Sequence, residues 1–424
     1  MTEMNSAMCG KPFESMLVPY RALDMTDEKG FLCAKTLADL GCDVIKIEKP
    51  GGDRDRRIGP FYHGECHPEE SLNWFAFNAN KRGITLDIET ADGKEIFKKL
   101  VKKSDFVIES FPVGYLDGLS IGYSDLSKVN DQVILTSITP FGDSGPYRDY
   151  KACDIVAMAM GGLLNICGDP DRPPVTPGFP ASYLLGGVEA ALGTLMALRW
   201  RRISGRGTVV KVSLQDEVLT ASWDSVPYWS GSRTISKRSG PFSIRPNVSY
   251  RIIWPCKDGY VTFFYFGGQT GAEGNRAIVD WMESEGIDCG PVREQKWESF
   301  DWDRLKQNEV GLLEKPLYPF FMSHTKKELY EGAVRRNIIL YPLAGAKDIL
   351  NNQQLKERSY WTEVRHPELQ SSIMYPGAFV KSSCTYCGVS KRAPLIGEHN
   401  QEIFMGELGF SKEDLISLKQ SGVI

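Results

Sequence analysis

The sequence of 424 residues has no long apolar run, no cluster of basic residues and only five histidines. Its longest nearly uninterrupted apolar stretch, Ile155–Leu164, is about half the roughly 20 residues of a membrane-spanning helix, so we expect no membrane segment. Lysine and arginine (50) nearly balance aspartate and glutamate (54). This balance argues against nucleic acid as a partner, because phosphate binding requires clustered cations. The opening MTEMNSAMCGKPFESM lacks the cationic and apolar regions of an export signal, which predicts a cytoplasmic protein.

Several sequence fingerprints of catalytic and metal sites are also missing. Neither nucleotide-binding fingerprint occurs, and no G-x-S-x-G turn is present. His63, Cys66 and His67 lie in one short loop without a nameable fourth ligand, so we interpret them as surface residues and expect no metal. The ten cysteines are scattered except for Cys384 and Cys387, and we expect them to be reduced thiols without a disulfide.

The first half of the chain alternates short apolar strands with amphipathic helices. Gly41 ends one expected helix, and Thr90 is a plausible N-cap of another. Strands are expected at 44–47, 83–87, 105–109 and 133–138. A long helix is expected at 184–200, with apolar residues at helical spacing. This alternation predicts a doubly wound α/β domain, with a mostly parallel sheet covered by helices on both faces.

The texture of the sequence changes after residue 231. Proline, glycine, serine and aromatic residues become frequent, and two strands are expected at Tyr250–Pro255 and Tyr260–Tyr265, joined by a turn at Lys257–Gly259. Helical patterns return after about Lys326, and a last helix is expected at Lys412–Lys419. These changes predict a second, smaller α+β domain.

Two charged loops flank expected strands of the first domain. The first follows the strand at 44–47 and contains Lys46, Glu48, Lys49, Asp53, Arg54, Arg56 and Arg57. The second, Asn78–Arg82, precedes the strand at 83–87. Open α/β sheets bind ligands at the carboxyl ends of their strands, where lysine and arginine suit anions. Both loops could serve one anionic ligand, and an ordinary solvated loop is the alternative.

Seven segments resemble, in this order, the class III CoA-transferases, also called the CaiB/BaiF family. They are LADLGCDVIKIEKPGGD (37–53), FNANKRGITLDIE (77–89), DFVIESFPVGYLDGLSIGYSDL (105–126), TSITPFGDSGPY (136–147), ACDIVAMAMGGLL (152–164), GTLMALRWRRISGRGTVVKVSLQDEV (193–218) and APLIGEHNQEIFMGELGFS (393–411). The resemblance implies a large Rossmann-like domain and a small α+β domain, in an interlocked dimer. The large domain would comprise 1–222 and 345–424, the small domain 245–325, and the linkers 223–244 and 326–344.

The resemblance also implies a ligand, namely a coenzyme A thioester that acts as a substrate and not as a tightly bound cofactor. By similarity, Lys49 would lie near the CoA nucleotide, and Asn80 and Lys81 near the ligand cleft. Glu28, Lys29 and Gly30 would lie on the first loop, facing the thioester. Arg82 and Tyr183 are candidates for holding a substrate carboxylate.

One residue that the chemistry of the family needs is missing. In the family, an aspartate attacks the acyl-CoA thioester and forms a mixed anhydride. Tyr183 stands at that position, and no acid occurs between Asp171 and Glu189. A phenol cannot form an acyl anhydride. The basic residues that many members place at the equivalents of Gly118 and Thr139 are also absent.

A chain with the fold but without the nucleophile fits a subunit that supports a catalytic paralogue. We therefore predict the non-acylating subunit of a heteromer, whose partner is a paralogue bearing the catalytic aspartate. The pattern is most similar to heteromers that move CoA from succinyl-CoA to an aromatic succinate such as (R)-benzylsuccinate, in anaerobic aromatic degradation. The alternative is a self-sufficient homodimeric transferase, lyase or isomerase that uses Glu189 or Asp154. The simpler interpretation of Asp154 is a helix N-cap, and that of Glu189 is a partly buried acid. A CoA-binding regulator is a third possibility.

Overall fold

A computed structural model describes residues 15–245 and 247–424, which form two compact units. The first unit comprises the chain up to Leu163, Pro177–Thr234 and Gln354–Ile424. The second unit comprises Leu164–Thr176 and Ile235–Gln353. The C-terminal part of the chain therefore returns to the unit that contains the N-terminal half.

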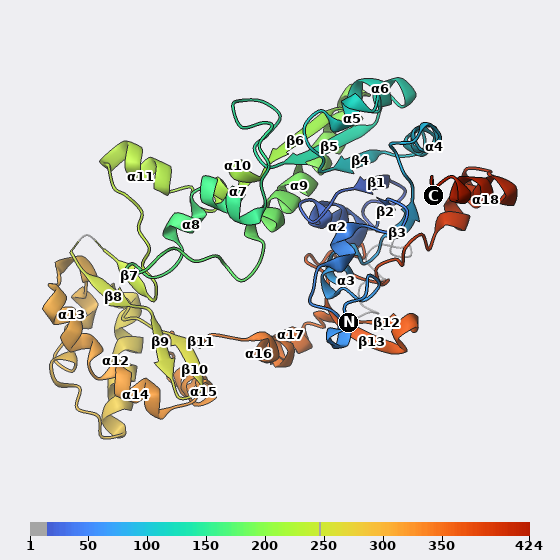
Figure 1. The fold of residues 1–424 in the computed structure, drawn as a ribbon. Helices are drawn as coiled ribbons and strands as arrows, with labels where there is room; N and C mark the ends of the chain where they lie inside the picture. The colour runs from blue at the N-terminus through green and yellow to red at the C-terminus, as the bar shows by residue number, and fades with distance from the viewer. Residues whose placement is uncertain (1–14, 246) are drawn as a thin grey trace. The chain divides into compact units, whose positions relative to one another are not determined.

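The first unit is built on a six-stranded parallel sheet with the strand order β3-β2-β1-β4-β5-β6 (Figure 1). The strands are β1 (Arg21–Met25), β2 (Asp43–Glu48), β3 (Arg82–Thr85), β4 (Phe106–Glu109), β5 (Ile134–Thr139) and β6 (Val209–Ser213). This is the order of a doubly wound Rossmann sheet, in which β1 and β4 flank the point where the chain reverses direction across the sheet. The predicted parallel α/β architecture is confirmed.

Alternate residues of each strand face opposite sides of the sheet, and each side has its own apolar core. Ala22 and Val44 pack on one side with α2 (Phe31–Asp39) and α9 (Ala181–Ser204). Leu23 and Ile45 pack on the other side. There they meet α4 (Ala91–Val101), α6 (Tyr123–Val129), the segment Gln401–Glu407 and the end of the chain after α18 (Lys412–Gln420). Strands this thoroughly covered require apolar residues on both faces, as the sequence has.

Shorter elements complete the first unit. They are α3 (Leu72–Asn78), α5 (Tyr115–Gly118), α7 (Asp154–Met160), α10 (Leu214–Thr220), α11 (Ser225–Ser232) and the hairpin of β12 (Trp361–His366) and β13 (Ser371–Pro376). Two more short helices, α8 (Leu163–Ile166) and α17 (Gln353–Glu357), lie where the chain passes between the units. Thr90 caps α4 as expected, since its hydroxyl accepts the N–H of Gly93 at 3.0 Å.

Helix α9, with 24 residues, is long and apolar enough to cross a membrane by length and composition. More than half of its apolar window, 56%, is buried inside the structure. The core helix of a globular unit meets the same criteria, so this helix alone is weak evidence for a membrane segment. Gly186 and Gly187 allow its close packing, because a Cβ there would lie 2.3 Å from Leu214 and 2.8 Å from Leu32.

The second unit is a smaller α+β body with its own aromatic core. Its strands are β7 (Phe242–Ile244), β8 (Ser249–Arg251), β9 (Ile253–Cys256), β10 (Gly259–Thr262) and β11 (Tyr341–Pro342). Its helices are α12 (Gly268–Ser284), α13 (Gln307–Glu314), α14 (Leu317–Ser323), α15 (Lys326–Arg335) and α16 (Ala346–Asn351). Trp254, Phe320 and Phe321 are buried at its centre. The expected turn at Lys257–Gly259 joins β9 to β10.

Candidate functional site

A cavity of about 850 Å³ opens at the carboxyl ends of the parallel strands of the first unit. Its walls come from the loops that follow β1, β2, β4 and β5, including Asp27, Asp53, Ser110 and Ala152. Ligands of doubly wound sheets bind at this edge, where loops from the two halves of the sheet separate. The topology therefore places the candidate site here.

The β1–α2 loop forms the floor of this site and is held rigidly. Asp24, fully buried at the end of β1, accepts the N–H and the hydroxyl of Thr26 at 3.0 and 2.7 Å. Asp27 accepts the hydroxyl of Ser110 at 2.8 Å, which joins the loop after β1 to the loop after β4. Gly30, the N-cap of α2, lies at a point of close contact, because a Cβ there would lie 2.5 Å from Cγ2 of Thr26.

Replacing Gly30 by alanine is expected to lower the free energy of unfolding by about 1–3 kcal/mol, because the new methyl group would overlap Thr26 and Ile138. Gly118→Ala is the matched control, since nothing lies within 4 Å of a Cβ at that position. The control should change stability by less than about 0.5 kcal/mol. Urea unfolding followed by circular dichroism measures both, and equal stability of the two variants would contradict the tight contact at Gly30.

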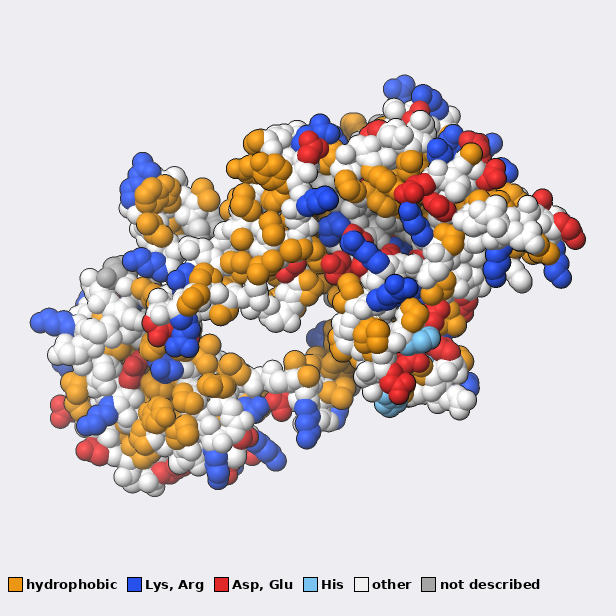
Figure 2. All heavy atoms as spheres, viewed as in Figure 1, with side chains coloured by type: hydrophobic (Ala, Val, Ile, Leu, Met, Phe, Trp, Pro, Cys, Tyr) orange, Lys and Arg blue, Asp and Glu red, His pale blue; other side chains and the backbone are white. Residues whose placement is uncertain are grey.

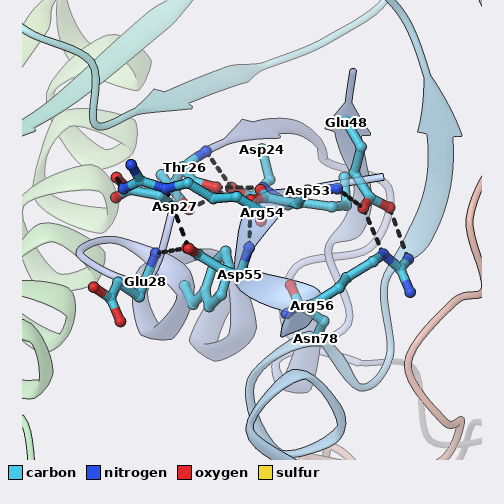
Figure 3. A network of polar contacts seen from close by, with 12 residues as sticks. Asp24, Thr26, Asp27, Glu28, Glu48, Asp53, Arg54, Asp55, Arg56 and Asn78 are labelled. Atoms are coloured by element: carbon cyan, nitrogen blue, oxygen red, sulfur yellow. Dashed lines mark hydrogen bonds and ion pairs between the residues drawn. The ribbon is translucent and has the colours of Figure 1, made fainter. Parts of the chain in front are cut away.

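The charged loop after β2 is anchored by a fully buried ion pair. The guanidinium of Arg56 donates to both carboxylate oxygens of Glu48 at 2.6 and 2.8 Å (Figure 3). It also lies 3.9 Å from the ring of Trp74. Arg56 also donates to Glu69 at 2.7 Å and to the carbonyl of Pro394 at 3.0 Å. Arg56 is completely buried, so it shapes the loop and does not face a ligand.

Five cations line the cavity, and most of them already have carboxylate partners. They are Lys29, Lys49, Arg54, Arg148 and Lys151. Lys29 pairs with Asp27, and Arg54 reaches the same carboxylate at 3.1 Å. Lys49 is exposed at the rim and pairs with Glu89 at 2.8 Å. The structure thus brings Lys29 and Lys49, two residues expected near a CoA ligand, to one cavity.

Tyr183 lies in the first turn of α9, with its ring buried and its hydroxyl directed at the start of α7. The backbone N–H of Asp154 donates to the phenolic oxygen at 2.9 Å. In return, Oδ1 of Asp154 accepts the N–H and the hydroxyl of Ser182 at 2.9 and 2.7 Å. Each helix start therefore satisfies a free N–H of the other. Asp154 is therefore not the N-cap of α7, a position that Cys153 occupies; it is the first residue of that helix, and its carboxylate accepts from the start of α9.

Burial raises the pKa of the Tyr183 phenol, and the nearby carboxylate of Glu28 raises it further. The phenol is therefore protonated at neutral pH and can donate its proton in a hydrogen bond. Glu28 is half-buried on the β1–α2 loop, and its side chain points away from Asp55, whose carboxylate instead accepts the N–H of Glu28 at 2.7 Å (Figure 3). Burial, together with Asp55 and Asp27, raises the pKa of Glu28. Sequence reasoning did not single out Glu28 as an acid beside Tyr183.

Glu189, the other acid considered as a nucleophile, lies further along α9. Burial raises the pKa of Glu217 on α10, and the charge of Glu189 is the next cause. This coupling places Glu189 close to the acids at the start of α10.

The residues before β3 serve the interior of the unit. The ammonium group of Lys81 is fully buried and donates to Asp24 at 2.8 Å, to Asn78 at 2.9 Å and to the carbonyl of Phe31 at 3.3 Å. Burial lowers the pKa of Lys81, whereas the charges of Lys81 and Lys46 keep the pKa of Asp24 low despite its burial. Lys81 thus stabilises the β1–α2 loop, which forms the floor of the cavity, from the interior of the unit.

Asn80 and Arg82 lie away from the cavity. The side-chain amide of Asn80 donates to Asp39 at 2.6 Å and makes hydrogen bonds with the backbone of the segment Gly388–Lys391. Arg82 is the first residue of β3. Its guanidinium donates to the carboxylate of Asp43, at the start of β2, at 2.9 and 2.6 Å. Its remaining donor reaches Glu402 and Glu407 at 2.6 and 2.7 Å. Because Asp43 and Arg82 start parallel strands, this network lies toward the amino ends of the sheet.

Glu109 is a buried acid at the carboxyl edge of the sheet that sequence reasoning did not single out. It ends β4 at the point where the sheet order reverses, and its carboxylate accepts the N–H of Phe111 at 2.7 Å. Burial raises its pKa to about 7. The sequence signal for Glu109 is an acid at the end of an otherwise apolar strand, at the carboxyl edge of the sheet.

The cysteines and histidines form no further site in the described part of the chain. Cys387 is a free thiol, as are Cys33, Cys42, Cys66, Cys153, Cys167, Cys256 and Cys289. No group of three or more histidine, cysteine, aspartate or glutamate side chains that could hold a metal is found among residues 15–245 and 247–424.

The sequence and the fold of the chain are similar to those of CoA-transferases. The model of CoA-transferase family III matches residues 21–400. Subunit BbsE of succinyl-CoA:(R)-benzylsuccinate CoA-transferase from Thauera aromatica is 32% identical, over 96% of this chain and 97% of that protein. The beta subunit of succinyl-CoA–L-malate CoA-transferase from Chloroflexus aurantiacus is 28% identical over 92% and 94%. A CaiB/BaiF family protein from Brucella suis superimposes with a TM-score of 0.78 at 24% identity, covering 93% of this chain and 99% of that one.

Proposed function

Because the chain belongs to CoA-transferase family III, we propose that it is the non-acylating subunit of a heteromeric CoA-transferase whose partner is a paralogue with the catalytic aspartate. The observation that carries this proposal is the place of Tyr183. It occupies the first turn of α9, beside the loop that the family resemblance assigns to the thioester, and its oxygen is a buried, protonated phenol. We also propose that this subunit lies in the cytoplasm, with its soluble thioester substrates.

The division of labour follows from the chemistry. In the partner, the aspartate attacks the thioester carbonyl and CoA leaves as a thiolate, which gives a mixed anhydride. The thiolate attacks the aspartyl carbonyl of this anhydride, which releases the donor acid as its carboxylate and forms aspartyl-CoA. The incoming carboxylate attacks aspartyl-CoA and releases the thiolate again, and attack of the thiolate on the acceptor carbonyl of the second anhydride gives the new thioester and regenerates the aspartate. Tyr183 cannot enter this sequence, but its hydroxyl proton can donate to a carbonyl or carboxylate oxygen of a bound ligand.

The substrates we propose are succinyl-CoA and an aromatic succinate such as (R)-benzylsuccinate. Two relatives support the succinyl donor, since their names describe succinyl-CoA transferases, and both are named as subunits. The carboxyl-edge cavity has the size of a ligand site, and its walls combine apolar residues such as Ile47 and Leu86 with cations. We assign the CoA thioester to this cavity, with Lys49 toward the nucleotide and Glu28, Lys29 and Gly30 toward the acyl group. We assign no CoA contact to Asn80, Lys81 or Arg82.

An apolar face of α9 is the surface we assign to the partner. Five residues spaced three or four apart along the helix are half exposed or more: Val188, Leu192, Met196, Trp200 and Ile203. Figure 2 shows hydrophobic side chains gathered over the region of α7, α9 and α10. A continuous apolar stripe of this length is unusual on a free surface and typical of a subunit interface.

Replacing Met196, which is 64% exposed, by glutamate is expected to abolish copurification with the paralogue, because a charge would be buried in the apolar interface. Ile416→Glu is the matched control, since Ile416 is an equally apolar, 50% exposed residue on α18. Coexpression with a tag on one subunit measures both variants. Retention of the partner by the Met196 variant, at the level of the control, would contradict this interface.

A further inference from the structure

The cations of the carboxyl-edge cavity differ in whether their charge is already neutralised. Lys29 and Arg54 share Asp27, Lys49 pairs with Glu89, and Arg148 pairs with its neighbour Asp149 at 3.3 Å. Lys151 also lines the cavity, but within the described residues no carboxylate pairs with it. A lining cation without a counter-charge is suited to an anionic ligand.

The position of Lys151 along the chain fixes the end of the cavity that it serves. It precedes Asp154 by three residues, a stretch of at most roughly 11 Å. The N–H of Asp154 donates to the hydroxyl of Tyr183, and Ala152, between them, lines the cavity. Lys151 therefore lies three residues before the start of α7, to which Tyr183 is hydrogen-bonded, whereas Lys49 lies on the separate loop after β2.

We propose that Lys151 binds the free carboxylate at the far end of a dicarboxylic acyl group and so selects succinyl-type thioesters over neutral ones. This assignment rests on the proposed function, which places the thioester beside the β1–α2 loop and Tyr183. In this proposal the four-carbon acyl chain runs along the loop after β5, with its terminal carboxylate at the ammonium group of Lys151. The aliphatic part of such a chain suits the apolar wall that includes Met25 and Pro140.

The ligand at this end is a carboxylate and not a phosphate of CoA. The phosphates of a bound CoA are separated from the thioester by the long pantetheine arm, and we assign the nucleotide to the loop of Lys49. Lys151 is exposed to solvent as well as to the cavity, so screening limits its contribution. A change of about tenfold in affinity, and not a complete loss, is expected from its removal.

The test uses two thioether analogues that cannot transfer an acyl group, S-(3-carboxypropyl)-CoA and S-butyl-CoA. Titration calorimetry of the full-length chain measures both affinities, and the same titrations are repeated on the heteromer. Lys151→Gln is expected to weaken the carboxylated analogue about tenfold and to leave S-butyl-CoA unchanged. Lys151→Arg should keep the preference, and Lys151→Glu should reverse it. Lys102→Gln, an exposed lysine at the end of α4, is the control.

The outcomes separate the two levels of the proposal. An equal effect of Lys151→Gln on both analogues, or no effect on either, would overturn the assignment of Lys151 while leaving CoA binding intact. Failure of the unmodified chain and of the heteromer to bind either analogue would instead contradict the CoA cavity, and the proposed function with it.

Discussion

Replacing Arg56 by methionine is expected to lower the free energy of unfolding by about 3–5 kcal/mol, the cost of leaving a buried charge without its partner. Arg56 and Glu48 are both completely buried, and their carboxylate–guanidinium contact is bidentate at 2.6 and 2.8 Å. The same loop provides Lys49 and Arg54 to the cavity. Urea unfolding measures the stability, and calorimetry with S-butyl-CoA should show weaker binding in the same variant.

The neighbouring residue offers a matched control. Arg57 lies in the same short turn but is exposed, so Arg57→Met should change stability by less than about 0.5 kcal/mol. A double variant, Arg56→Met with Glu48→Gln, removes both charges and should recover part of the loss. If Arg56→Met and Arg57→Met were equally stable, the ion pair would not be the anchor of this loop.

Turnover of the heteromer is expected to depend on the acid of the partner and only weakly on Tyr183. Replacing the partner's aspartate by asparagine should reduce kcat roughly a thousandfold or more, because it removes the only nucleophile. Tyr183→Phe should reduce turnover by no more than about tenfold, as expected for one lost hydrogen bond. Initial rates of succinyl-CoA consumption with a dicarboxylic acceptor measure both variants.

The stability of the Tyr183 variant must be measured beside its activity, since the N–H of Asp154 loses its acceptor. That loss is expected to cost about 1–3 kcal/mol of stability without removing chemistry. A reduction of kcat by Tyr183→Phe as large as that from the aspartate variant, in a folded heteromer, would show that this chain takes part in the chemical step.

The sequence predicted the architecture well, because the architecture depends on local periodicity. The strand 44–47 became β2, the N-cap Thr90 caps α4, and the long helix was found within a few residues at each end. These features are encoded by neighbouring residues. The chain-wide resemblance to the CaiB/BaiF family is confirmed by the matching family model.

The site could be predicted only in part, because charge patterns along the chain do not reveal where side chains point. The basic loop after β2 contains Arg56, which looks like a phosphate ligand in sequence but is fully paired inside the protein. The guanidinium of Arg82 is likewise paired with the carboxylate of Asp43. The partners of Arg56 and Arg82 include Pro394 and Glu402, which lie far away along the chain. Such contacts depend on the tertiary fold.

In the proposed division of labour, this chain does not carry the acyl group during transfer. The most direct test treats the heteromer with succinyl-CoA, quenches it in acid and measures the intact mass of each subunit. We expect an adduct that hydroxylamine removes on the partner alone, with this chain at its unmodified mass. An adduct on this chain, located by peptide mapping at Glu28, Asp154 or Glu189, would contradict it.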